Sequence, residues 1–170
     1  TRGHTTSQAV TRRALGGNAS SRALLVLDGV PQADPFGGWV NWPAYDPASL
    51  AEARVIRGGG SVSFGPRALA GVIDLASQAD KALEGSIQGG SRQSLHGRGY
   101  WGADLGPGLL TLNVRGARSD GFIPVTRATR GPADRPAPYK QAALRSRWVA
   151  PIGGQPELQL AGLAFLDQRA

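Results

Sequence analysis

Leu24–Pro31 reads LLVLDGVP, and the other expected elements of the N-terminal part are arranged around this stretch. Its first four residues form a continuous apolar run, which is typical of a short strand buried on both faces. Asp28 and Gly29 then form a turn signal that ends the strand. A second strand is expected at Arg54–Ile56 and a third at Val72–Leu75, with a run of glycines between them. The pattern therefore predicts a compact module built on three short strands.

A short helix is expected between the first two strands. Pro47–Ala53 reads PASLAEA, and we expect one to two helical turns there. Proline suits the first position of a helix, and the Asp46 side chain can cap the free amides that follow. The predicted order is strand, helix, strand, turn, strand, which is an α+β module with a mixed sheet and short helices.

These segments together resemble the plug domain of TonB-dependent outer-membrane receptors. That family has a strand ending in Asp-Gly-Val, a loop, a short helix, a strand ending in Arg-Gly, a serine, an aromatic-glycine pair, a small-residue run and a final apolar strand. The matching segments are Leu25–Pro31, Pro47–Ala53, Val55–Gly58, Ser61, Phe64-Gly65, Ala68–Gly71 and Val72–Leu75. Phe64, Ala70 and Asp74 stand where tyrosine, glycine and asparagine are usual. The resemblance implies structural roles for Asp28, Gly29, Gly58, Ser61, Phe64, Gly65 and Gly71.

Composition limits the chemistry. The 170 residues include no methionine and begin in a polar stretch, so we expect an internal fragment. No run of eighteen apolar residues is present, which excludes a helical membrane span. Without cysteine there is no disulfide or thiolate site, and His4 and His96 are too far apart in sequence to indicate a metal site. Asp28 is better explained as a turn acceptor than as one of a carboxylate pair with Asp34. We therefore expect no enzyme activity, no catalytic residue, no metal site and no cofactor.

The formal net charge of +7 comes almost wholly from arginine. A nucleic-acid surface is one interpretation, but the arginines are scattered between glycines and not clustered with stacking aromatics, so no nucleic-acid partner is expected. Solvated arginines, or arginines that face a water-filled lumen or anionic lipid headgroups, remain open alternatives. The Gly58–Ser61 run lacks the Lys-Ser/Thr that a nucleotide-binding loop needs.

From Lys81 onward the hydrophobic pattern has period two, which predicts five antiparallel strands of about ten residues, each apolar on one face. The apolar positions include Leu83, Ile87, Trp101, Leu105, Leu110, Leu112, Val114, Leu144, Trp148, Leu158, Leu160 and Leu166. Such strands suit a soluble sandwich or a membrane barrel. The connections are short except for Asp120–Pro138, and this asymmetry favours the barrel. We therefore expect the C-terminal half of a plug domain at residues 1–80 and the first five strands of an incomplete transmembrane β-barrel at residues 81–170.

The loop at residues 31–45 is the predicted ligand site. It is long for a connection, and it carries aromatic side chains beside polar ones, as surfaces that hold amphipathic ligands do. The candidate ligand-binding residues are Phe36, Trp39, Asn41, Trp42 and Tyr45. The alternative is that these rings pack onto a barrel wall. The resemblance also implies that Arg57 contacts the barrel.

The resemblance implies a receptor in the bacterial outer membrane that takes up a scarce ligand such as a siderophore-iron complex, cobalamin or an oligosaccharide. Its expected partners are a TonB-type energy-transducing protein, engaged through a segment absent here, the small-molecule or chelate ligand, and the outer membrane with its lipopolysaccharide. The competing hypothesis is a soluble β-rich surface domain that binds glycan or protein.

Overall fold

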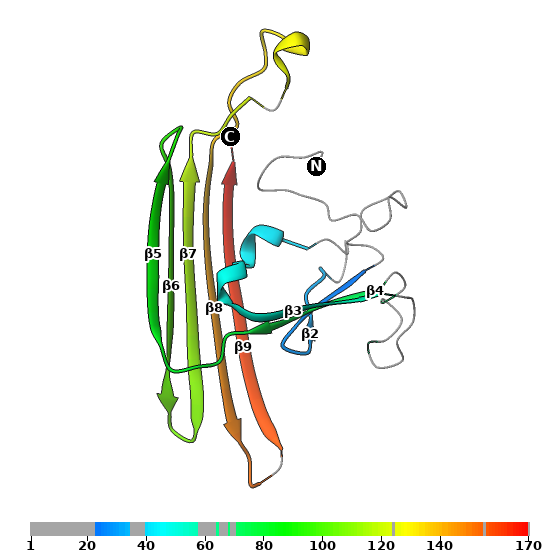
Figure 1. The fold of residues 1–170 in the computed structure, drawn as a ribbon, viewed down its shortest axis with the longest axis vertical. Helices are drawn as coiled ribbons and strands as arrows, with labels where there is room; N and C mark the ends of the chain where they lie inside the picture. The colour runs from blue at the N-terminus through cyan, green and yellow to red at the C-terminus, as the bar shows by residue number, and fades with distance from the viewer. Residues whose placement is uncertain are drawn as a thin grey trace. The chain divides into compact units, whose positions relative to one another are not determined.

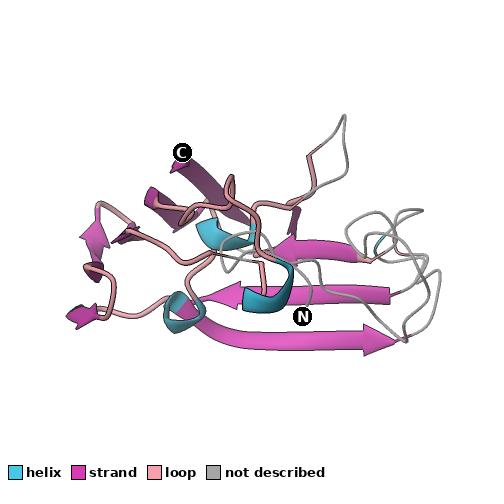
Figure 2. Cartoon of the chain, turned by 90° about the horizontal axis from the view of Figure 1, so that it is seen from above, coloured by secondary structure: helices cyan, strands magenta, loops and turns pink. Residues whose placement is uncertain are grey.

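The computed structural model describes residues 23–34, 40–57, 64, 68, 71–123, 125–154 and 156–169. Two compact units divide the chain, Thr1–Gln78 and Ala79–Ala170. Helical segments among the described residues are single 3-10 turns, drawn in cyan in Figure 2. None of the helices in these ranges has the length and apolar character needed to cross a membrane.

The first unit contains a mixed four-stranded sheet in the order β2-β1-β4-β3 (Figure 1). Its strands are β1 (Leu24–Leu27), β2 (Val30–Pro31), β3 (Leu50–Arg57) and β4 (Gly71–Ser77). The pair β1 and β4 is parallel, and the other two pairs are antiparallel. The three predicted strands and the mixed sheet are therefore confirmed, and β2 is a short addition after the Asp-Gly turn.

The apolar run of β1 is buried over its whole length, as its composition predicts. Leu24, Val26, Ala68 and Val72 form a buried cluster against which Ile56 and Phe64 pack. Leu25, on the opposite side of β1, is only 1% exposed. Removing a side chain of this size from water stabilises the fold by about 1.5–3 kcal/mol, so the LLVL run anchors the unit.

The turn between β1 and β2 explains the Asp-Gly pair. Leu27 pairs with Val30, which leaves Asp28 and Gly29 as a two-residue loop with φ of 51° and 82°. Hairpin loops of this length need positive φ at both positions, and aspartate and glycine adopt it most readily.

The helix expected at Pro47–Ala53 is wrong beyond its first turn. Pro47–Ser49 forms a 3-10 turn, η3, and the Asp46 carboxylate accepts a hydrogen bond from the Ala48 amide at 3.1 Å, which confirms the predicted cap. The chain then enters β3, where Ala53 pairs with Leu75 of β4. Helical propensity in a seven-residue segment is too weak to compete with a sheet edge that offers unpaired backbone groups.

The second unit is a five-stranded antiparallel sheet in sequence order, as predicted. Its strands are β5 (Leu83–Gly90), β6 (Ser94–Leu105), β7 (Gly108–Ser119), β8 (Tyr139–Pro151) and β9 (Glu157–Arg169). They run lengthwise beside one another, and the long β7–β8 connection, with the turn η5 (Arg127–Thr129), projects from one end (Figure 1). This end is called the loop end below, and the other is the short-turn end.

Candidate functional site

Asp28 joins the hairpin turn to the end of β4. Its carboxylate accepts a hydrogen bond from the Ser77 amide at 2.8 Å, and its own amide donates to the Leu75 carbonyl at 2.9 Å. The aspartate thus holds the turn across the parallel pair of strands. The structure places Asp28 and Gly29 in the turn itself, and the role that the resemblance implies for them stays a prediction.

The predicted aromatic ligand site is only partly described. Phe36 and Trp39 lie outside the described residues. Asn41 precedes the 3-10 turn η2 (Trp42–Ala44), whose first residue, Trp42, is half-buried. The indole nitrogen of Trp42 is buried and has no hydrogen-bond partner among the described residues.

Tyr45 holds the loop to the end of β2. The Tyr45 ring is buried, and its hydroxyl donates a hydrogen bond to Oε1 of Gln32 at 2.9 Å. The Tyr45 amide also donates to the Trp42 carbonyl at 3.1 Å, which closes η2. Tyr45 therefore fixes the shape of the loop in this conformation, and its contact with a ligand stays a prediction.

The other predicted residues lie around β3 and β4. Arg57 is exposed at the end of β3, directly opposite Gly71, which begins β4 with a φ of 121°. Phe64 packs against the buried cluster. Gly58, Ser61 and Gly65 lie outside the described residues. On β3, Arg54 donates two hydrogen bonds to the exposed Glu52, and this contact lowers the pKa of the Glu52 carboxyl group.

One face of the five-stranded sheet is apolar and uncovered. Register places Gly85, Gly99, Val114, Leu144 and Ala164 in one row across all five strands, and Leu83, Trp101 and Leu112 in a neighbouring row. Leu83 is 83% exposed, Ile87 80% and Leu166 70%. Large apolar side chains at this exposure over a whole sheet face are typical of a surface that another apolar phase covers.

The opposite face of the same sheet is polar. Arg98 donates to the Ser86 hydroxyl at 2.8 Å, and the Arg147 guanidinium donates to Oε1 of Gln159 at 3.1 and 3.2 Å. Gln141 donates to the Asp167 carboxylate at 3.2 Å. Neighbouring strands thus join their polar side chains into cross-strand pairs, and this face suits contact with water.

Two tryptophans lie on the apolar face, Trp148 near its short-turn end and Trp101 one row nearer the centre of the sheet. Trp101 pairs with Leu112, and Trp148 pairs with Leu110 in the next row. The Trp148 indole donates a hydrogen bond to the Leu105 carbonyl at 3.0 Å, so its ring is held at the end of the strand. Tryptophan has an apolar ring and a polar N–H, and it concentrates where apolar and aqueous phases meet.

The long connection Asp120–Pro138 has a closed base at the loop end. The Asp120 amide donates to the Arg92 carbonyl at 3.0 Å, and the Ala137 amide donates to the Phe122 carbonyl at 3.2 Å. The Arg92 guanidinium also lies 5.8 Å from the centroid of the Phe122 ring. These contacts attach the connection to the β5–β6 turn.

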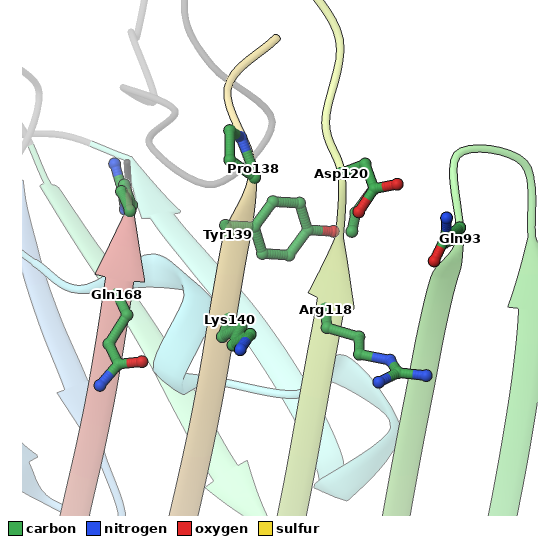
Figure 3. Close-up of a pocket in the computed structure, with 9 residues that line it drawn as sticks. Gln93, Arg118, Asp120, Pro138, Tyr139, Lys140 and Gln168 are labelled. Carbon is green, nitrogen blue, oxygen red and sulfur yellow. The ribbon is translucent and has the colours of Figure 1, made fainter.

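A pocket of about 330 Å³ opens beside this base. It is lined by Gln93, Arg118, Ser119, Asp120, Pro138, Tyr139, Lys140, Gln168 and Arg169. Figure 3 shows Arg118, Lys140 and Gln168 on adjacent strands, with Tyr139 and Asp120 nearer the tips. Sequence reasoning did not single out this pocket. Arg118 and Lys140 flank the Asp120–Pro138 connection in the sequence, but their pairing depends on the strand register, which a connection of this length does not fix.

Among the described residues no group of three or more His, Asp or Glu side chains is placed to hold a metal ion. The described part of the aromatic loop offers the rings of Trp42 and Tyr45, and the pocket at the loop end offers the cations Arg118 and Lys140.

A comparison with models of known protein families finds a match for the first unit. Residues 1–72 match the model of the family described as TonB-dependent Receptor Plug Domain. This match confirms the resemblance to TonB-dependent receptor plug domains that the sequence shows, over this part of the chain. Plug domains of this kind belong to outer-membrane receptors and transporters and not to enzymes. A search of curated proteins finds no match for the chain.

Proposed function

We propose that the chain joins the C-terminal half of a plug domain, residues 1–80, to the first strands of an outer-membrane β-barrel, residues 81–170, in a receptor that takes up a scarce ligand. One observation carries the proposal. A sheet that is apolar and uncovered on one face and polar on the other follows directly after the plug sequence. In an outer-membrane barrel the apolar face contacts lipid and the polar face lines the interior.

The dimensions of the apolar face support this proposal. From Leu158 to Leu166 the apolar positions of β9 cover eight residue steps, or about 27 Å along the strand. A strand tilt of about 40° reduces this to about 21 Å, close to the apolar band of about 25 Å in outer-membrane barrels. Trp148, which pairs with Leu160 near the short-turn end of this span, would then lie toward the periplasmic interface, and the long connection would lie outside the cell.

A closed barrel needs further strands. The smallest such barrels have about eight strands, and here β5 and β9 each have one neighbour in a sheet of five. The proposal therefore includes additional strands in a longer receptor, together with a TonB-type energy-transducing partner. The ligand would be a scarce molecule such as an iron chelate, cobalamin or an oligosaccharide.

A matched pair of substitutions tests the assignment of the two faces. Leu144 on β8 and Leu163 on β9 are 47% and 41% exposed, lie near mid-strand and belong to opposite faces. In the full-length receptor folded into lipid vesicles, Leu144→Glu should lower the free energy of unfolding by about 2 kcal/mol, because the charge would face lipid. Leu163→Glu, directly opposite Arg145, should change it little.

Urea titration of both variants provides the measurement. Equal losses in Leu144→Glu and Leu163→Glu would contradict the membrane assignment and favour a soluble β-rich domain, in which neither exposed position contacts lipid.

The aromatic loop provides the proposed ligand contact. Replacing Trp39 and Trp42 together with alanine should weaken ligand binding by several kcal/mol (roughly 2–4) if the rings are central anchors. Calorimetric titration with ferric chelates, cobalamin and oligosaccharides would identify the ligand first and then measure the loss. If the double variant is expressed normally and its affinity for the ligand is unchanged, the loop is not part of the ligand-binding site.

A further inference from the structure

The apolar face of the five-stranded sheet ends in a cationic row at the loop end. Arg118 pairs directly with Lys140, and Lys140 pairs with Gln168. Two residues nearer the centre of the sheet, the row on the same face consists of Gly116, Ala142 and Leu166. On β7 and β8 the side chains therefore change from apolar to cationic within one row, on the face that we assign to lipid, while Leu95 of β6, which pairs with Arg118, keeps its end of that row apolar.

Arg118 and Lys140 have no ion pair or side-chain hydrogen bond with any residue that the structure describes. Both side chains are exposed and line the 330 Å³ pocket (Figure 3). Two other cations near the ends of the sheet have carboxylate partners: Lys81 pairs with Asp104, and Arg169 pairs with Asp167. Two adjacent cations without a carboxylate partner form a binding site for an anion with several oxygens.

Charge is distributed unequally along the strands. The loop end carries Arg92, Arg118, Arg127, Arg130, Arg135, Lys140 and Arg169 against Asp120, Asp134 and Asp167. The short-turn end carries Lys81, Arg145 and Arg147 against Asp80, Glu84, Asp104 and Glu157. The electrostatic field therefore attracts anions to the loop end, where the connection projects.

We propose that Arg118 and Lys140, with Gln168 beside them, bind the phosphate of a phosphorylated lipid in the outer leaflet. The inference rests on the proposed membrane function. A lipid suits the site better than free phosphate because the cations continue the apolar face: acyl chains would lie over Ala142 and Leu166 while the phosphate reaches the row above them. The long arginine and lysine side chains can place their charges at headgroup level.

Binding of lipid A by the full-length receptor in detergent micelles tests the site. The double variant Arg118→Gln/Lys140→Gln should bind bisphosphorylated lipid A about 25-fold more weakly, since each cation near an anionic lipid surface contributes about five-fold. The matched control is Arg127→Gln/Arg130→Gln, which removes two charges from η5 and its neighbour outside the pocket. The control should lose less than about two-fold.

Dephosphorylated lipid A and inorganic phosphate identify the group that is recognised. Wild-type receptor should prefer the phosphorylated lipid, and inorganic phosphate in millimolar amounts should not displace it. Equal losses in the two double variants would overturn the site in favour of general charge attraction. Equal binding of both forms of lipid A would overturn recognition of phosphate, and displacement by inorganic phosphate would overturn the choice of a lipid.

Asp120 provides an independent test of whether the bound group is negatively charged. Its carboxylate lines the same pocket and would repel a phosphate, so Asp120→Asn should bind phosphorylated lipid A about two- to five-fold more tightly. Weaker or unchanged binding would contradict the proposed position of the phosphate. Recovery of the wild-type receptor in the outer-membrane fraction is measured in parallel, and its absence there would count against the proposed function and not against this site alone.

Discussion

Asp28 shows why one residue type is needed at one position. It must adopt a φ of 51° and also accept a hydrogen bond from the Ser77 amide. Aspartate and asparagine can do both, because their short polar side chains tolerate the left-handed region and carry an acceptor oxygen. Alanine can do neither.

Replacement of Asp28 with alanine should therefore free the Ser77 amide. The lost hydrogen bond is worth about 1 kcal/mol, which corresponds to roughly five-fold faster amide exchange at Ser77. Asp28→Asn should keep most of the protection. Hydrogen exchange of the folded receptor followed by mass spectrometry measures the rates. An Asp28→Ala variant with the wild-type exchange rate at Ser77 would show that the bond does not hold the strand end.

Gly121, at the base of the long connection, is a second position where one residue type is needed. It has a φ of 73°, and a Cβ added there would lie 1.9 Å from the Ala137 carbonyl oxygen. Gly121→Ala should therefore destabilise the closed base of the connection by about 1–2 kcal/mol, so that the base opens more often. Gly131→Ala is the matched control, since its Cβ would meet nothing closer than 3.8 Å.

Trypsin digestion of the folded receptor measures this opening, because Arg127 and Arg130 lie in the connection. Gly121→Ala should be cleaved several-fold faster after these arginines than the wild type (about five-fold for 1 kcal/mol), and Gly131→Ala should be cleaved at the wild-type rate. Equal cleavage rates for the two variants would show that the closed base of the connection does not require glycine at position 121.

At the scale of elements, the sequence was most informative where burial alone decides the structure. The LLVL run and the period-two strands from Leu83 onward appear in the structure as strands. The helix expected through Ala53 failed because β4 offered a pairing partner that lies about twenty residues further along the chain. A local propensity contains no information about such a partner.

The candidate binding residues show the same limit of prediction from sequence. The aromatic residues of the 31–45 loop could be named from the sequence, but the bond from Tyr45 to Gln32 could not, because it depends on how the loop returns to β2. The row of Arg118 and Lys140 depends on strand register, which only a specific turn geometry fixes. Single-strand patterns give the face of a residue and not its neighbours across the sheet.

For the whole molecule, we propose that the five-stranded sheet is part of the wall of an outer-membrane β-barrel. In water such a sheet has an uncovered apolar face, and its edge strands β5 and β9 expose unpaired backbone groups. Both features promote association between chains. Detergent would cover the apolar face but would leave the edges open.

Size-exclusion chromatography of residues 1–170 without detergent is the most direct test of this claim. The account predicts an aggregate or a broad distribution of oligomers, with amide protection concentrated in the plug strands β1 and β4. Detergent should shift the distribution to smaller species. A compact monomer in plain buffer, with protected amides throughout β5–β9, would contradict the assignment of this sheet to an outer-membrane barrel. It would instead support a soluble β-rich domain.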